Sequence, residues 1–258
     1  MIIAIDVGNT NVVIGSMEGS RVLSSARVLT KRDATAYEYA MDVKSALEFN
    51  NVNINEAEGA IISSVVPSVT ESLRVALKLI GIKRVLVVGS GIKTGLNIKI
   101  DDPAQLGSDL AVAAVAALAI GNAPLIVIDM GTATTITAIA EDGSFIGGAI
   151  IPGVVISLNA LASGASLLPN VPITAPGKSI GTNTVECMQS GSVIGAAAML
   201  DGMIERFEAE IGQPCGIIAT GGLSKTVIPL CKRKDIRLEP ELILLGLSLI
   251  WEKNKKRK

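Results

Sequence analysis

The sequence predicts an α/β protein made of two similar domains. Near the N-terminus an apolar strand runs into Asp6, a small polar turn follows, and a second run of β-branched residues comes next. The same strand, Asp-x-Gly turn and strand recur at Asp129, and the offset of 129 − 6 = 123 residues is close to half of the 258 residues. This repeat indicates a duplicated domain, with the ligand between the copies.

A weaker second repeat supports the duplication. Ala60–Ser64 matches Gly216–Thr220, and each reads as a strand that ends in a loop of small residues. The offset here is 216 − 60 = 156 residues, so the second copy would need an insertion. Chance similarity between apolar strands is the alternative explanation, and the Asp-x-Gly within matched flanks makes it the weaker one.

In the first half, the sequence predicts an opening hairpin followed by alternating strands and helices. Thr35 is expected to cap the first helix, and Ser68 or Thr70 the second, just after Pro67. Residues 93–105 read as irregular, and an Ala-rich helix closes this half. The expected strands are 21–28, 59–64 and 84–88, and the expected helices run from 35 to 49, from 68 or 70 to 80, and from 109 to 120.

The second half repeats this plan after the turn at 121–124. Asp142-Gly143 predicts a hairpin turn, and Pro152-Gly153 is expected to open a helix. The predicted domains are therefore residues 1–121 and 122–258. The expected strands are 125–129, 134–140, 144–151, 216–220 and one near 236, and the expected helices are 153–161, 183–211, one after 222, and 239–252.

The composition bounds the class of protein. Hydrophobic residues make up 49% and mean hydropathy is +0.51, which is high for a soluble chain and is explained by a subunit interface. No apolar run approaches the ~20 residues that span a bilayer, and no signal peptide precedes Asp6. We therefore expect no membrane partner.

Charge and side-chain chemistry narrow the function further. Net charge is −1 with basic residues dispersed outside the tail at 253–258, so no nucleic-acid groove is expected. Cys187, Cys215 and Cys231 lack a zinc spacing and read as reduced thiols of a cytoplasmic protein. Because the chain has no His, Ser–His–Asp, Cys–His and His–metal chemistry are excluded.

The first polar turn suits a polyphosphate. Asp6 ends an apolar strand, where an unpaired carboxylate would be costly, and Gly8 allows close approach of a large group. Asn9, Thr10 and Asn11 add amide and hydroxyl groups at the same point. A carboxylate for Mg²⁺ beside donors for phosphate oxygens fits this pattern, and an ordinary Asx-type hairpin turn is the alternative.

Several motifs together resemble the type III pantothenate kinases, within the superfamily of sugar kinases, actin and chaperone ATPases. The resemblance covers essentially the whole chain and implies duplicated actin-like (ribonuclease H-like) domains with a nucleotide cleft between them. It also implies a homodimer that phosphorylates pantothenate to 4'-phosphopantothenate with ATP, the first step of coenzyme A synthesis. The motifs are DVGNTN at 6–11, SSVVP at 63–67, GSD at 107–109, DMGTATT at 129–135, GG and PG at 147–148 and 152–153, NTVE and QSG at 183–186 and 189–191, and TGG at 220–222.

The resemblance implies roles on the ATP side. Asp6 would organise Mg²⁺ through water, and Asp129 would lie at a monovalent cation site for K⁺ or ammonium. Gly221 and Gly222 would lie beneath adenine. The phosphates would be held by Asp6, Val7, Gly8, Asn9, Thr10, Asn11, Val12 and Val13 from the first half and by Thr132 from the second.

The resemblance also implies an acceptor site. Asp109 would be the general base on the pantothenate hydroxyl, since a carboxylate can take that proton without a His. The residues alone leave another reading open, in which Asp109 only caps the following helix. Asp101 and Asp102 precede Pro103 and read as turn residues. The implied substrate contacts are Ile100, Gly107, Ser108, Asp109, Leu110 and Thr184.

The chain departs from the family pattern around the acceptor. That pattern is usually Tyr-Asp-Asn-Pro and then Gly-x-Asp-Arg, whereas this chain has Ile100 for the Tyr and Leu110 for the Arg. A leucine cannot make the charge-assisted contact that an Arg makes with a carboxylate. Two alternatives therefore stay open: a kinase of this fold for a less anionic hydroxyl substrate, and a nucleotide-binding regulator of the Bvg accessory factor type.

Overall fold

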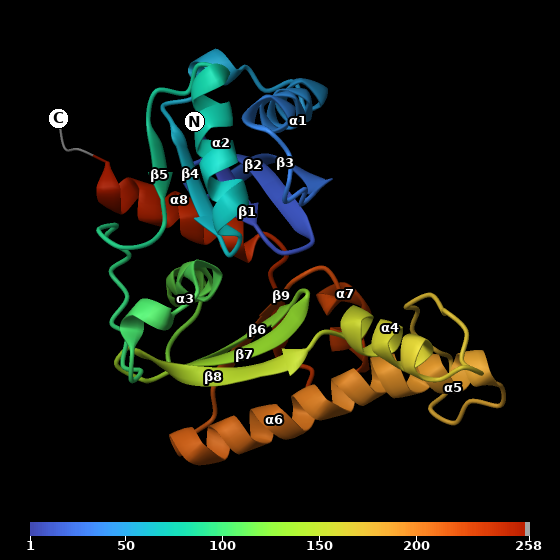
Figure 1. Cartoon of the computed structure of the whole chain (residues 1–258). Coiled ribbons are helices and arrows are strands. Elements are labelled where there is room, and N and C mark those ends of the chain that lie inside the picture. The colour runs from blue at the N-terminus through green and yellow to red at the C-terminus, as the bar shows by residue number, and fades with distance from the viewer. Residues whose placement is uncertain (256–258) are drawn as a thin grey trace. The chain divides into compact units, whose positions relative to one another are not determined.

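The computed structural model describes residues 1–255, which form two compact units (Figure 1). The first unit comprises residues 1–96, 101–120 and 241–255, and the second comprises residues 97–100 and 121–240. The predicted domains, 1–121 and 122–258, differ from these units in the placement of residues 97–100, residue 121 and the segment from residue 241 that contains the last helix. Within the described residues, no helix is long and apolar enough to cross a bilayer.

The first unit is a mixed five-stranded sheet in the order β3-β2-β1-β4-β5, with helices on both faces. The alternation of β1 side chains builds two cores: Ile3 and Ile5 pack with α1 and α2, whereas Ile2 and Ala4 pack with α3 and α8. The elements are β1 Ile2–Val7, β2 Asn11–Glu18, β3 Arg21–Leu29, α1 Ala36–Phe49, β4 Ala60–Ser64, α2 Pro67–Leu79, β5 Val85–Val87, α3 Ser108–Ile120 and α8 Leu242–Asn254.

The second unit is a mixed five-stranded sheet in the order β10-β9-β6-β7-β8. Ile126 and Ile128 of its central strand pack against the long helix α6 and the short helix α7. The elements are β6 Leu125–Met130, β7 Ala133–Ile139, β8 Phe145–Pro152, α4 Val154–Gly164, α5 Thr184–Gln189, a π-helical turn Ser190–Ile194, α6 Gly195–Ile211, β9 Gly216–Thr220, α7 Ser224–Val227 and β10 Ile236–Leu238.

The two sheets have the same topology, which confirms the predicted α/β architecture. In each, a central strand pairs antiparallel with the next strand and parallel with a later one. Asp6 lies opposite Ser63 and Asp129 opposite Thr220, so the offset of the second repeat is 220 − 63 = 157 at this register. The β6–β7 turn is one residue shorter than the β1–β2 turn.

Helix starts follow the sequence in one case and not in another. The Thr35 hydroxyl accepts from the Glu38 N–H and the Thr35 N–H donates to the Glu38 carboxylate, a capping box that confirms the predicted N-cap of α1. The prediction for α2 is wrong, because that helix starts at Pro67 and Val66 occupies its N-cap. Thr70 instead donates its hydroxyl toward Ser64.

Candidate functional site

The β1–β2 turn is held in place by the end of β3. The Thr30 hydroxyl donates to the Gly8 carbonyl at 2.7 Å, and the Thr30 N–H donates to the Thr10 carbonyl at 2.9 Å. Arg32 donates to the Asn9 side-chain oxygen at 2.9 Å. The Gly8 N–H also donates to the Asn11 carbonyl at 2.9 Å, so the turn is held in one conformation and needs no reorganisation to meet a phosphate. Val12 is fully buried and pairs with Val7 in the sheet, so it supports the turn from within the core.

The start of α3 is joined to the carboxyl end of β4. The Ser108 hydroxyl lies 3.1 Å from the Ser63 hydroxyl, accepts from the Ser64 N–H at 3.1 Å and donates to the Ser64 carbonyl at 3.0 Å. Because Ser63 of β4 pairs with Asp6 of β1, these contacts bring the first turn of α3 to the carboxyl end of β1. Asp6 and Asp109 therefore lie on elements that meet at the carboxyl ends of β1 and β4.

Asp109 is a partly buried carboxylate within the first turn of α3. The helix begins at Ser108, so Asp109 lies inside the first turn rather than at the N-cap. Its Oδ1 accepts from the Leu110 N–H at 2.9 Å, and a Cβ on Gly107 would lie only 2.5 Å from that oxygen. Burial raises the pKa of Asp109, and the backbone hydrogen bonds only partly offset that rise.

The β6–β7 turn of the second unit is packed between two glycines. Gly221 has a φ of +91°, and a Cβ there would lie 2.5 Å from Asp129 Oδ1 and from the Met130 amide nitrogen. A Cβ on Gly153 would overlap the carbonyl oxygen of Thr132. Only glycine fits at both points. The structure thus brings together Asp129, Thr132 and Gly221, three of the residues that the sequence predicts for the ATP side.

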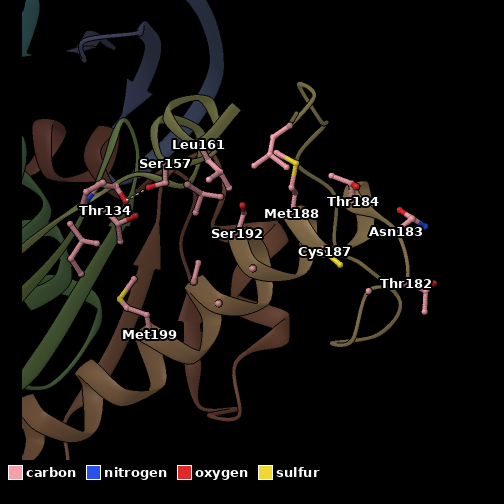
Figure 2. A pocket seen from close by; sticks show the side chains of 18 residues that line it. Thr134, Ser157, Leu161, Thr182, Asn183, Thr184, Cys187, Met188, Ser192 and Met199 are labelled. Atoms are coloured by element: carbon pink, nitrogen blue, oxygen red, sulfur yellow. Dashed lines mark hydrogen bonds between the residues drawn. The ribbon is translucent and has the colours of Figure 1, made fainter. Parts of the chain in front are cut away.

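Thr184 lines a cavity of about 810 Å³ in the second unit (Figure 2). The hydroxyl and amide groups of Thr182, Asn183 and Thr184 lie at one end, and Leu161 and Met199 contribute apolar surface. The sequence predicts Thr184 as a site residue but does not indicate that the other residues form a cavity with it. Its other lining residues are Thr134, Ile151, Pro152, Val154, Ser157, Leu168, Gly181, Cys187, Met188, Gly191, Ser192, Gly195 and Ala196.

The loop between α4 and α5 is hydrogen-bonded to α5. Gln189 donates to the Pro172 carbonyl at 3.1 Å and to the Thr174 hydroxyl at 2.8 Å. The Thr182 N–H and hydroxyl both donate to Glu186, at 2.9 and 3.0 Å. The π-helical turn of residues 190–194 widens the helix beside the cavity, and such turns are frequent at functional sites. Periodicity could not have predicted it.

Three further predicted residues and Asp102 are found in different parts of the two units. Ile100 belongs to the second unit, in a segment whose Ile98 bridges to Phe145 of β8. Leu110 lies in the first unit, next to Asp109, and Gly222 is exposed beyond β9. Asp102 accepts from the Ala104 N–H at 3.0 Å and caps the short helix at Pro103, which confirms its reading as a turn residue.

The described residues fit a Mg²⁺ ion that the nucleotide would bring. Among residues 1–255 no three His, Cys, Asp or Glu side chains are grouped to hold a metal. A Mg²⁺ ion often binds through one or two carboxylates together with substrate phosphates and water. Asp6, at the end of β1 beside the β1–β2 turn, can supply such a carboxylate.

Comparisons with known proteins agree on one family. A family model described as type III pantothenate kinase matches residues 2–206. The type III pantothenate kinase of Geobacillus sp. (strain WCH70) is 42% identical over 259 residues, covering 100% of both chains. That of Moorella thermoacetica is 40% identical over 255 residues, covering 98% of this chain and 100% of the relative.

Solved structures with low identity share the fold. A putative Baf family transcriptional activator from Campylobacter jejuni has a TM-score of 0.62 at 18% identity, covering 99% of this chain and 100% of the other. An activator of 2-hydroxyisocaproyl-CoA dehydratase from Clostridium difficile, with bound ADPNP, has a TM-score of 0.58 at 10% identity and covers 100% and 98%. These likenesses support the two-domain actin-like fold and nothing finer.

Proposed function

The chain belongs to the type III pantothenate kinases, which phosphorylate pantothenate with ATP, and we propose that Asp109 is the general base of this reaction in it. The observation that carries the proposal is the placement of this carboxylate. It is partly buried, it lies in the first turn of α3, and Ser108 beside it is bonded to the end of β4. A desolvated carboxylate with a raised pKa is a stronger base toward a hydroxyl proton than an exposed one.

The proposed reaction divides among named residues. Asp109 accepts the proton of the pantothenate hydroxyl as its oxygen attacks the γ-phosphorus, and the bond to the β-phosphate oxygen breaks to leave ADP. The turn at residues 8–11 holds phosphate oxygens, and Asp6 would hold Mg²⁺ through water, which would neutralise phosphate charge. Thr132 holds phosphate from the second unit, and Gly221 and Gly222 lie under adenine. Phosphoryl transfer requires such positioning and charge neutralisation more than covalent chemistry.

We also propose that Asp129 helps to bind a monovalent cation, K⁺ or ammonium. Its carboxylate lies at the end of β6, and Gly221 and the β6–β7 turn pack closely around it. A cation beside this turn would add positive charge where the phosphates of ATP are held. The family resemblance supports this role, and the packing around the carboxylate gives it a physical basis.

The acceptor site lacks the expected Arg. Leu110 is half-buried beside Asp109 and cannot bond the pantothenate carboxylate. A hydrogen bond to a charged group is typically worth ~1.5–3 kcal/mol, so its uncompensated loss would weaken substrate binding by roughly 10–150-fold. Proposed substrate contacts of Ile100, Gly107 and Thr184 would not supply the missing charge, because none of them is a cation.

The carboxylate contact can be tested with a matched pair of substrates. We expect the enzyme to release ADP with pantothenate, Mg²⁺ and K⁺ or ammonium, and to use pantothenate much better than its neutral amide if another Lys or Arg binds the carboxylate. Equal use of both would mean that no charged partner is present. In that case Leu110→Arg should favour the acid by about 10-fold or more. If ADP is released with neither pantothenate nor its amide, pantothenate is not the acceptor. That result would favour a kinase for another substrate or a nucleotide-binding regulator.

We further propose a homodimer. Large apolar side chains are exposed on α4, on α5 and on the segment between them, and monomers rarely expose so many together. These side chains are Val155, Ile156, Leu161, Leu167, Ile180 and Val185. The free cysteines and the ATP-dependent reaction support a cytoplasmic location.

The dimer gives a direct prediction. Sedimentation at micromolar concentration should show a species of twice the 26.6 kDa chain mass. Ile156→Glu, which puts a charge on the exposed face of α4, should shift the protein toward monomer. Phe49→Glu is the control, because Phe49 is 88% exposed but lies on α1 in the other unit. A parent protein found only at the chain mass would refute the proposal.

A further inference from the structure

Two serines, of which Ser63 is fully buried, join the carboxyl end of β4 to the start of α3. Ser63 is fully buried near the end of β4 and pairs with Asp6 in the parallel register. Ser108 is the first residue of α3, and its hydroxyl lies 3.1 Å from that of Ser63. The expected role of Ser108 is contact with substrate, and no role is expected for Ser63 beyond its place in a motif.

The hydrogen bonds of Ser108 can be counted. A serine hydroxyl has one hydrogen to donate and two lone pairs to accept. Ser108 donates to the Ser64 carbonyl at 3.0 Å and accepts from the Ser64 N–H at 3.1 Å. Because its single hydrogen is used on that carbonyl, the remaining contact is one in which Ser63 donates to Ser108. The Ser108 hydroxyl therefore uses its whole capacity on β4, and only its backbone is left for a substrate.

We infer that Ser63 and Ser108 are positioning residues, which hold the first turn of α3, and with it the Asp109 carboxylate, at the carboxyl end of β4. The inference rests on the proposed role of Asp109 as base. Three hydrogen bonds from one side chain to one strand end fix the start of the helix, and Asp109 is the next residue along the chain. Misplacement of a reacting group by about 1 Å can cost 10²-fold in rate, so such a clamp affects turnover directly.

The second unit has a hydroxyl residue at the position equivalent to Ser63, but it makes a different contact. Thr220 occupies the register position of Ser63, opposite Asp129 rather than Asp6. Its hydroxyl donates to the Pro240 carbonyl at 3.5 Å, so the equivalent hydroxyl of the second sheet serves a different contact. Thr220 is also buried, so a threonine occupies the equivalent position of the second sheet. Ser63→Thr is thus a conservative variant that keeps the hydroxyl.

Steady-state kinetics of single variants test the clamp. We expect Ser63→Ala and Ser108→Ala to lower kcat by roughly 10–100-fold, with the KM for ATP within about twofold of the parent value. Ser63→Thr should restore most of the loss. Ser16→Ala is the matched control, because Ser16 is equally buried in the same unit and bonds the Ser24 hydroxyl at 2.7 Å, away from α3. It should keep the parent kcat even if its thermal midpoint falls.

A double-variant cycle separates this inference from the role of Asp109. If Ser63 acts through Asp109, adding Ser63→Ala to Asp109→Asn should leave the residual rate unchanged, because the base is already absent. A low rate in Asp109→Asn together with parent kcat in Ser63→Ala would overturn the positioning role and leave the base in place. A further fall in the double variant would likewise overturn it. Parent kcat in Asp109→Asn would overturn the proposed base and the inference together.

Discussion

Replacement of Asp109 by Asn should lower kcat by about 10²–10⁴-fold, the usual range for loss of a general base. The amide has nearly the same shape and can still accept from the Leu110 N–H through its oxygen. It cannot accept the proton of the substrate hydroxyl. The KM for ATP should stay near the parent value, since the β1–β2 turn and Asp6 are unchanged.

The same variant should be at least as stable as the parent at neutral pH. Burial raises the pKa of Asp109 above that of the unfolded chain, so the folded state binds the proton more tightly. Stability therefore falls as pH rises from the unfolded pKa through the raised folded pKa, and the lower stability persists above it. Asparagine carries no charge to desolvate, so its thermal midpoint at pH 7 should equal or exceed that of the parent.

A matched control makes the result specific. Asp42 is another partly buried Asp on a helix of the first unit, α1, and its carboxylate forms an ion pair with Lys31 at 3.2 Å. Asp42→Asn therefore changes a similar residue away from α3. It should keep the parent kcat. Parent turnover in Asp109→Asn, measured as ADP release with saturating pantothenate, would mean that Asp109 is not the base. A large loss in both variants would point to a general defect of folding.

Much of each sheet could be predicted because its strands are defined by local pattern. The runs that end at Asp6 and Asp129 are apolar and are punctuated by glycine, which is sufficient to predict a strand, a turn and a strand. The position of α8 was not predictable in this way. Its apolar residues would suit a core in either half, and its place in the first unit depends on Gly246, where a Cβ would overlap the Val112 carbonyl of α3.

The site was predicted less completely than the fold, for a related reason. Motifs identify residues such as Asp109 and Thr132, but they do not show how hydroxyl groups are used. Ser63 and Ser108 are 45 residues apart, and their contact exists only once α3 packs on β4. The cavity beside Thr184 likewise depends on a loop whose position is fixed by Gln189, a contact that no periodicity indicates.

The second large effect is expected at Gly221, in the loop after β9. Gly221→Ala would place a methyl group against Asp129 Oδ1 and the Met130 amide, both 2.5 Å from the built Cβ. Neither is the end of a flexible side chain that can move aside without disturbing the β6–β7 turn. We expect kcat/KM for ATP to fall by about 10²-fold, because a shift of about 1 Å in a binding group can cost that much. The K⁺ or ammonium concentration for half-maximal activity should rise as well.

Gly212→Ala separates this steric effect from the cost of the backbone conformation. Gly212 ends α6 with a φ of +87°, close to the +91° of Gly221, but nothing lies within 4 Å of a built Cβ. Both variants should therefore lose about 1–2 kcal/mol of stability from an L-residue at positive φ. Only Gly221→Ala should also change the kinetics toward ATP and the monovalent cation. If the two variants have the same kinetics, the packing of Gly221 against Asp129 does not matter to ATP binding, and the proposed cation site loses its support.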